Sequence, residues 1–109
     1  MVSCQTERLT LVPVSLTEVA QYYDLSGNAE VMRFIAPPAT SIEQAMASVE
    51  RMTRVWEQHG WGIFSLYETA SHLFVGRCGL APLESGPEVE LAYTLLPQFW
   101  GKGLATEAA

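Results

Sequence analysis

Two glycines separated by a single residue, Gly101 and Gly103, follow an apolar run from Val89 to Leu95 near the end of the sequence. The run favours a β-strand, and the residues after Gly103 favour a helix. Glycine allows the backbone to approach a ligand closely, and the first N–H groups of a helix lack internal partners and lie at the positive end of its dipole. A strand, a glycine loop and a helix start in this order therefore predict a site for a phosphate or pyrophosphate.

Lys102, the only lysine of the chain, lies between these two glycines. Two interpretations of it stay open: a direct contact with the phosphate, or a solvated loop residue. A P-loop nucleotide site is disfavoured, because in a P-loop the lysine follows the last glycine and is itself followed by Ser or Thr.

The composition limits the class of protein. The chain has 109 residues, 49% hydrophobic and 17% charged, which suits one folded domain. No apolar run approaches the roughly 20 residues that span a bilayer, and the first residues do not resemble a signal peptide, so we expect a cytoplasmic protein. A net charge of −6 argues against nucleic acid as a partner. The cysteines Cys4 and Cys78 form neither a disulfide framework nor a metal-binding spacing, and no metal is expected.

Alternation and capping signals predict an α+β fold. Strands are expected at residues 8–13, 61–68, 73–80 and Val89–Leu95, and short turns make the last three an antiparallel meander. Capping boxes at Ser15/Glu18 and Ser41/Gln44 predict helices that run to about residue 25 and about residue 59, with a shorter helix at about residues 29–35 between them. We therefore expect the N-terminal strand and the helices to pack on the meander, which leads into the strand–loop–helix site.

The last two strands carry further signals. Gly76 and Gly79 indicate a bulge or a close backbone contact in their strand. Alternate residues of the last strand share one face, which we expect to belong to the core: Val89, Leu91, Tyr93 and Leu95.

The glycine loop also carries a family resemblance. Gln98-x-x-Gly101-x-Gly103 resembles the Q/R-x-x-G-x-G/A signature of the GNAT N-acetyltransferases. The longer stretch 93–108 is similar to the branch that acetylates ribosomal-protein N-termini, and residues 6–11, 28–35 and 75–80 resemble further segments of the same branch. The resemblance implies an N-acetyltransferase domain over residues 1–109 that is incomplete at its C-terminal end, since it covers about the first two-thirds of the family domain.

The resemblance implies acetyl-CoA as the co-substrate. In the family the loop amides bind the pyrophosphate and the backbone of the preceding strand aligns with the pantetheine arm. Transferred residue by residue, the coenzyme contacts fall on the end of the last strand and on the glycine loop: Thr94, Leu95, Leu96, Gln98, Phe99, Trp100, Gly101, Lys102 and Gly103.

Acetyl transfer also needs a base for the amine and a donor for the oxyanion. Glu90 is the candidate base, because relatives commonly carry an acidic residue two positions before a glycine; the alternatives are a solvated strand residue and Glu88 as the base. Ala92 stands where the branch usually has that glycine.

Two functions follow as hypotheses. The first is an acetyl-CoA-dependent N-acetyltransferase that acts on a primary amine, either a protein N-terminus or a small amine. The second is an incomplete acetyltransferase-like module that acts by coenzyme A binding or by self-association. Without a parallel neighbour, the last strand would present unpaired N–H and C=O groups, so a homo-oligomer through that strand is expected.

Overall fold

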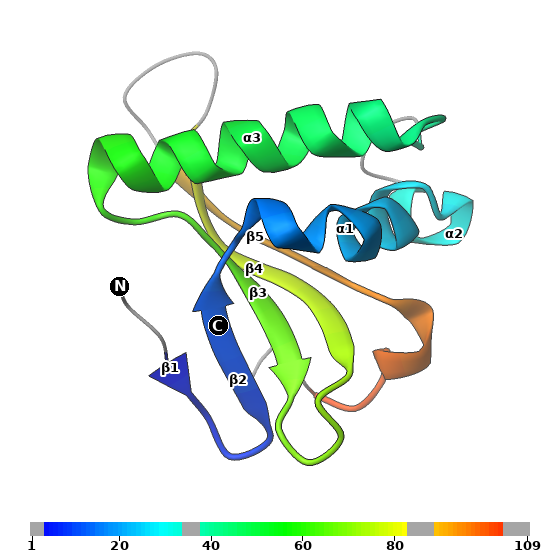
Figure 1. The fold of residues 1–109 in the computed structure, drawn as a ribbon. Helices are drawn as coiled ribbons and strands as arrows, with labels where there is room; N and C mark the ends of the chain where they lie inside the picture. Colours follow the sequence, from blue (N-terminus) through cyan, green and yellow to red (C-terminus); the bar gives the residue numbers. More distant parts are fainter. Residues whose placement is uncertain (1–3, 34–37, 83–88, 104–109) are drawn as a thin grey trace.

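The fold is an antiparallel sheet with its helices gathered on one face. The structure is a computed structural model, and it describes residues 4–33, 38–82 and 89–103. The strands are β1 (Cys4–Gln5), β2 (Leu9–Pro13), β3 (Ile63–Glu68), β4 (Phe74–Pro82) and β5 (Val89–Leu95). They form one sheet in the order β1-β2-β3-β4-β5 with every pairing antiparallel, so β5 is an edge strand of the described sheet (Figure 1). The α+β class and the meander are confirmed.

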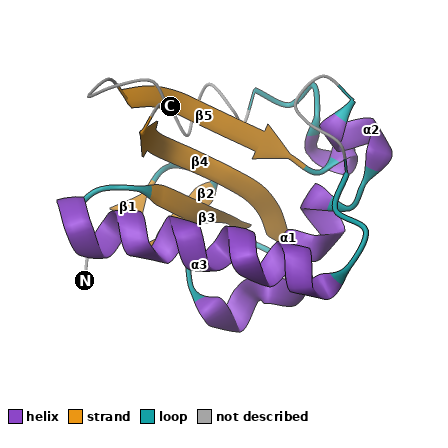
Figure 2. Cartoon of the chain, turned by 90° about the horizontal axis from the view of Figure 1, so that it is seen from above, coloured by secondary structure: helices purple, strands orange, loops and turns teal. Residues whose placement is uncertain are grey.

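The helices are α1 (Val19–Ser26), α2 (Ala29–Met32) and α3 (Ile42–His59), with 3₁₀ turns η1 (Leu16–Glu18) and η2 (Pro97–Phe99). Figure 2 shows α1 and α3 on the same face of the sheet. A first cluster of buried side chains fills the space between these helices and the strands: Val14, Tyr22, Val49, Met52 and Ile63.

The helix starts follow from the capping residues. Ser15 and Glu18 form the predicted capping box, in which the Ser15 N–H donates to Glu18 Oε1 at 2.8 Å. The first turn is 3₁₀ and not α, so α1 itself begins only at Val19. Ser41 accepts from the Gln44 N–H as predicted, but Gln44 Oε1 accepts from the N–H of Thr40, one residue before the cap.

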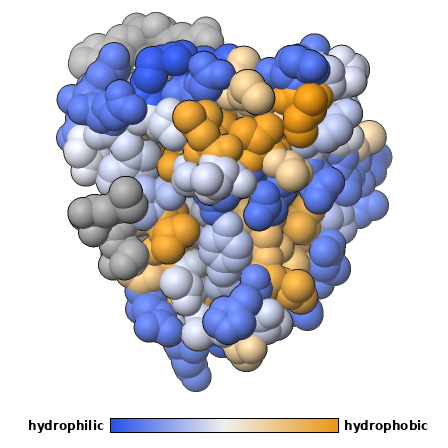
Figure 3. Space-filling model, viewed as in Figure 1, coloured by the Kyte–Doolittle hydropathy of each residue, from blue (hydrophilic) through white to orange (hydrophobic). Residues whose placement is uncertain are grey.

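Gly60 ends α3 with a left-handed φ of 75°, and its N–H donates to the Trp56 carbonyl at 2.9 Å. The length predicted for α3 is therefore confirmed. Its apolar side is not wholly covered, because Ile42 and Met46 are 40% and 43% exposed. Apolar side chains accordingly show among charged ones on the helix-bearing surface in Figure 3.

Some predicted boundaries differ from the observed ones. α2 ends at Met32, and the rest of its predicted span, like the helix predicted after Gly103, lies outside the described residues. β1 was not predicted, because two residues carry no periodic signal. The third strand begins at Ile63, two residues later than expected, and the fourth extends to Pro82.

Gly76 and Gly79 make the close backbone contacts that were predicted. A Cβ at Gly76 would collide with the Thr94 carbonyl, and a Cβ at Gly79 would collide with the Gly62 carbonyl. Gly76 therefore allows β5 to lie tightly against β4 at the point where β5 leads into the glycine loop.

The prediction that the odd-numbered face of β5 belongs to the core is wrong for most of the strand. Leu95 is buried at 7% exposure, whereas Leu91 and Tyr93 are 55% and 57% exposed and Val89 is 44% exposed. This face lies opposite the helices. Phe99 from the following turn covers it near Leu95, within a second buried cluster that includes Leu9, Leu11 and Leu66, but no described residue covers it further along the strand.

Candidate functional site

The outer edge of β5 carries backbone groups that no strand pairs in the described part of the chain. The Leu96 N–H donates to the Val75 carbonyl at 2.9 Å. Because antiparallel hydrogen bonding alternates along a strand, the N–H and C=O groups of Thr94 also point toward β4, and those of Tyr93 and Leu95 point outward. The end of β5 is therefore an open edge beside the glycine loop.

Trp100 occupies part of this edge. Its indole Nε1–H donates to the Leu95 carbonyl at 2.9 Å, which leaves the Leu95 N–H as the outward group nearest the loop. Of the strand residues predicted to contact a pantetheine arm, Leu95 presents its backbone outward, whereas the backbones of Thr94 and Leu96 face β4. Their contacts with a coenzyme remain predictions.

The glycine loop presents three consecutive N–H groups. Within η2 the Phe99 N–H donates to the Leu96 carbonyl and the Trp100 N–H to the Pro97 carbonyl, at 3.0 and 3.1 Å. The next three N–H groups, from Gly101 to Gly103, have no acceptor among the described residues, and all three residues are exposed. Both glycines have left-handed φ values, 76° and 74°. Of the five amides predicted to bind a pyrophosphate, these three are available to an anion.

The loop is held by a residue from the other end of the chain. Arg8, just before β2, donates from Nη1 to the Lys102 carbonyl at 2.9 Å. The Lys102 ammonium lies 5.7 Å from the centre of the Phe99 ring, and Phe99 is buried at 5% exposure. Sequence reasoning did not assign Arg8 this contact, because its only signal was that residues 6–11 matched the same family as the loop.

The remaining predicted residues lie apart from one another. Gln98 has an exposed side chain at the start of the loop. Glu90 is exposed and pairs with Ala81 in the β4–β5 register. It shares the helix-side face of β5 with Thr94, four residues or about 14 Å away along the strand. Glu88 lies outside the described residues. The role of Glu90 as a base remains a prediction.

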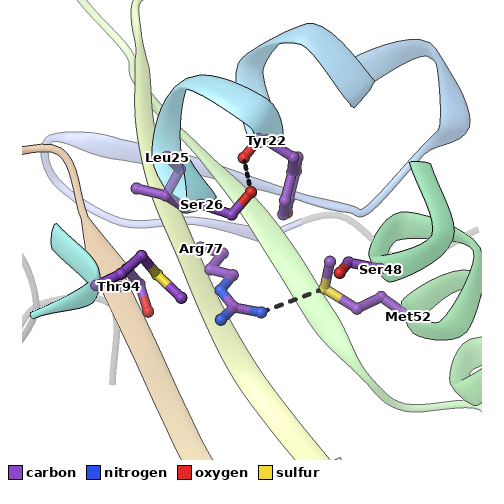
Figure 4. Close-up of a pocket in the computed structure, with 8 residues that line it drawn as sticks. Tyr22, Leu25, Ser26, Ser48, Met52, Arg77 and Thr94 are labelled. Carbon is purple, nitrogen blue, oxygen red and sulfur yellow. Dashed lines mark hydrogen bonds between the residues drawn. The ribbon is translucent and has the colours of Figure 1, made fainter. Parts of the chain in front are cut away.

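A cavity of about 80 Å³ lies on the helix side of β4 and β5, and sequence reasoning missed it. Figure 4 shows that its walls come from α1, α3 and both strands, with the Arg77 side chain crossing the middle. Arg77 donates from Nη1 to Met52 Sδ at 3.5 Å, and Thr94 is buried at 7% exposure on the adjacent strand. Burial lowers the pKa of Arg77 from its usual value, and the nearby Tyr22 opposes this shift. These side chains come from four separate elements, so no local pattern marked the cavity.

A buried carboxylate is linked through hydrogen bonds to Tyr22, one of the residues that line this cavity. Glu18 is 6% exposed, and its Oε1 accepts from the Ser65 hydroxyl at 2.7 Å, while its Oε2 accepts from the Tyr67 hydroxyl. The Tyr22 hydroxyl lies 2.9 Å from Ser65 Oγ. Burial is the main reason that the pKa of Tyr22 is raised well above the usual tyrosine range. The network joins the start of α1 to β3, and the hydrogen bond between Ser65 and Tyr22 partly opposes the effect of burial on the pKa of Tyr22.

Two other features do not occur among the described residues. They contain no group of three His, Cys, Asp or Glu side chains that could hold a metal ion. None of the helices that the structure describes is long and apolar enough to cross a membrane.

Comparisons with known proteins identify the family and the fold of the chain. The acetyltransferase (GNAT) domain family matches residues 8–109. A curated relative, the uncharacterized N-acetyltransferase p20 of Bacillus licheniformis, is 26% identical over 110 residues, which cover 99% of this chain and 62% of that protein. The chain thus spans less than two-thirds of the length of this relative.

Solved structures share the fold. An acetyltransferase from Agrobacterium tumefaciens str. C58 superposes with a TM-score of 0.86 at 24% identity, over 100% of this chain and 63% of that one. A GNAT-family acetyltransferase from Bacillus anthracis gives 0.78 at 17% identity, over 98% and 61%. RimL, a ribosomal L7/L12 α-N-protein acetyltransferase, gives 0.76 at 14% identity, over 97% and 59%. The match of the family to almost the whole sequence is decisive, and the chain belongs to the GNAT acetyltransferase domain family.

Proposed function

We propose that the chain binds acetyl-CoA through its glycine loop and takes part in the transfer of the acetyl group to a primary amine. The observation that carries this proposal is the row of three exposed N–H groups from Gly101 to Gly103, which have no acceptor among the described residues and follow an open strand edge. Adjacent N–H groups in a turn with left-handed residues form a concave anion site, which suits a diphosphate. The outward Leu95 N–H is then placed to bind the arm of the coenzyme.

The acceptor would be deprotonated at the helix-side face of β5. Glu90 takes the proton from the ammonium group, directly or through a water, and the free amine attacks the thioester carbonyl. A backbone N–H of the open edge stabilises the oxyanion, and collapse of the tetrahedral intermediate expels the thiolate of coenzyme A. Protein N-termini, as in the substrate named for RimL, and small amines both fit this chemistry.

Coenzyme binding is tested by calorimetry with coenzyme A and, for comparison, with pantetheine, which lacks the phosphates. We expect coenzyme A to bind at least ten-fold more tightly, and Gly101→Val to remove that advantage. Gly60→Val is the matched control, because Gly60 has the same left-handed φ of 75° and open space around it but lies at the end of α3. Equal affinity for the two ligands would show that the loop does not bind the diphosphate.

Transfer itself is tested by thiol release from acetyl-CoA with a panel of peptides and small amines. Glu90→Gln should lower kcat/KM by about 10²-fold or more, the usual size of a general-base contribution, while leaving coenzyme affinity unchanged. A Glu90→Gln variant with unchanged activity would remove Glu90 from the mechanism.

A second function is favoured by the exposed apolar face of β5. Leu91 and Tyr93 are more than half exposed on an edge strand, and such edges pair readily with another chain. We propose that two copies associate through this strand, so that the chain acts as a coenzyme-binding assembly module. Sedimentation velocity should show a dimer that Leu91→Lys dissociates, whereas Ile42→Lys, an exposed apolar residue on α3, should not affect it. A concentration-independent monomer would refute this second proposal.

A further inference from the structure

Arg77 is a partly buried cation whose charge no carboxylate neutralises in the described part of the chain. Its one hydrogen bond there goes to Met52 Sδ, a weak acceptor. The Tyr22 phenol also lines the cavity, and it supplies no counter-charge because burial raises its pKa above the usual tyrosine range. Partial removal of a guanidinium from water without a counter-ion costs free energy, and an anion that enters the cavity would offset this cost.

The cavity has a second polar group that is free to bind a ligand. Thr94 is almost fully buried, and its hydroxyl makes no hydrogen bond with any described residue. Arg77 and Thr94 are register partners on β4 and β5, so both side chains lie on the helix side of the sheet. Figure 4 shows the two side chains within the same cavity. Its volume of about 80 Å³ has room for a small group such as a carboxylate and not for a whole metabolite.

A larger hollow of about 400 Å³ lies beside the cavity between α3 and β4, and the two share Ser48, Met52 and Arg77 as lining residues. This hollow follows β4 as far as Ala81 and Pro82. Ala81 is the register partner of Glu90. The residues that line this hollow therefore extend about 13 Å along β4, from Arg77 to the register partner of the proposed base.

We propose that Arg77 binds the carboxylate of the acetyl acceptor, and that the acceptor is an amine whose carboxylate lies several bonds away from the amino group. Either an ω-amino acid or the N-terminus of a peptide with an acidic side chain has this form. A planar carboxylate suits a single guanidinium, which can donate two parallel hydrogen bonds to it, with the Thr94 hydroxyl as a third donor. The identification of this ligand as the acceptor rests on the proposed acetyltransferase function, but its binding does not.

The test is equilibrium binding to the full chain in the absence of acetyl-CoA. 6-Aminohexanoate is compared with hexylamine, and the peptide glycyl-aspartate α-amide, which keeps its side-chain carboxylate, with glycyl-asparagine α-amide. The net charge of −6 favours the cationic hexylamine at long range, so a preference for the zwitterion has to come from a local cation. We expect each carboxylate ligand to bind at least ten-fold more tightly than its partner in at least one of the two pairs, and that pair identifies the source. Equal affinities within both pairs would overturn the proposal.

Variants assign the preference to one residue. Arg77→Met should reduce the discrimination to less than two-fold, whereas Arg54→Met, the same change at an exposed position on α3, should preserve it. If Arg77→Met does not fold, Arg77→Lys takes its place and should weaken carboxylate binding by losing the paired hydrogen bonds. Discrimination that survives unchanged in the folded variant refutes the role of Arg77. Coenzyme A titrated into the same samples separates this result from the proposed function, because its site does not include Arg77.

Discussion

Replacing Arg8 tests whether the residue just before β2 holds the glycine loop in the conformation that binds coenzyme A. The Arg8 guanidinium donates to the Lys102 carbonyl at 2.9 Å, and Nη2 lies 3.7 Å from the position that a Cβ on Gly103 would take. Arg8→Met removes this charge-assisted bond without changing the apolar part of the side chain much. The loop then has to be ordered when the ligand binds, so the change should appear mainly in affinity for coenzyme A.

The size of the effect follows from the exposure of the bond. Hydrogen bonds to charged groups contribute about 1.5–3 kcal/mol, and the lower part of this range applies because this bond is exposed. A loss of about 1–2 kcal/mol corresponds to a roughly 5–30-fold weaker Kd. Thermal stability should change little, since the loop contributes few buried contacts apart from Phe99.

Calorimetry with coenzyme A measures this effect, with Arg54→Met as the control for loss of one positive charge. Arg8→Lys separates positioning from charge, because lysine keeps the charge but not the fork of donors. If Arg8→Lys binds coenzyme A with wild-type affinity and Arg8→Met binds it weakly only at low salt, the effect comes from long-range attraction between the positive charge and the anionic ligand. If Arg8→Met binds coenzyme A with wild-type affinity, the loop does not depend on Arg8 and the reasoning fails.

Three other substitutions test the packing around the site. Gly76→Ala should destabilise the fold by roughly 2–4 kcal/mol in urea unfolding, because the new Cβ collides with the Thr94 carbonyl; a loss below about 1 kcal/mol would mean that the strands separate easily. Tyr22→Phe should reduce the loss of folding stability at high pH. Because burial raises the pKa of Tyr22 in the folded state, the phenol of the unfolded wild-type chain ionises first, above about pH 10. This difference lowers the free energy of unfolding of the wild type by about 1.4 kcal/mol at pH 11, and the variant lacks this loss. If the free energy of unfolding falls as steeply between pH 9 and 11 in the variant as in the wild type, the phenol of Tyr22 does not have a raised pKa in the folded state. Trp100→Phe should lower the free energy of unfolding by about 0.5–1 kcal/mol, because the hydrogen bond to the Leu95 carbonyl is lost. Unchanged stability of this variant would show that the bond does not contribute.

Local patterns predicted most of the elements of the fold. The capping residues Ser15 and Ser41 start their helices, and Gly60 ends α3, because each forms hydrogen bonds with backbone only a few residues away. The strands of the meander follow from alternation between turns. The glycine loop was found for the same reason, since Gly101 and Gly103 specify left-handed backbone wherever the chain places them.

Periodicity identifies which residues share a face but not what covers that face. This is why Leu91 and Tyr93 were assigned to the core, although the structure leaves them exposed. The same limit applies to the availability of the loop amides. The Phe99 and Trp100 N–H groups are not free, because they form the hydrogen bonds of the 3₁₀ turn. The sequence contained no pattern that predicted this turn.

The amino-acid sequence alone determined the class of fold, the helix ends and the position of the glycine loop, because these depend on backbone preferences and on hydrogen bonds between near neighbours. Only the tertiary structure brought Arg8 to a carbonyl 94 positions away and gathered Arg77, Thr94 and Tyr22 around one cavity. Such contacts depend on strand register and on how the helices pack over the sheet. Strand register and helix packing depend on many residues together, and each residue contributes only part of the stabilising free energy.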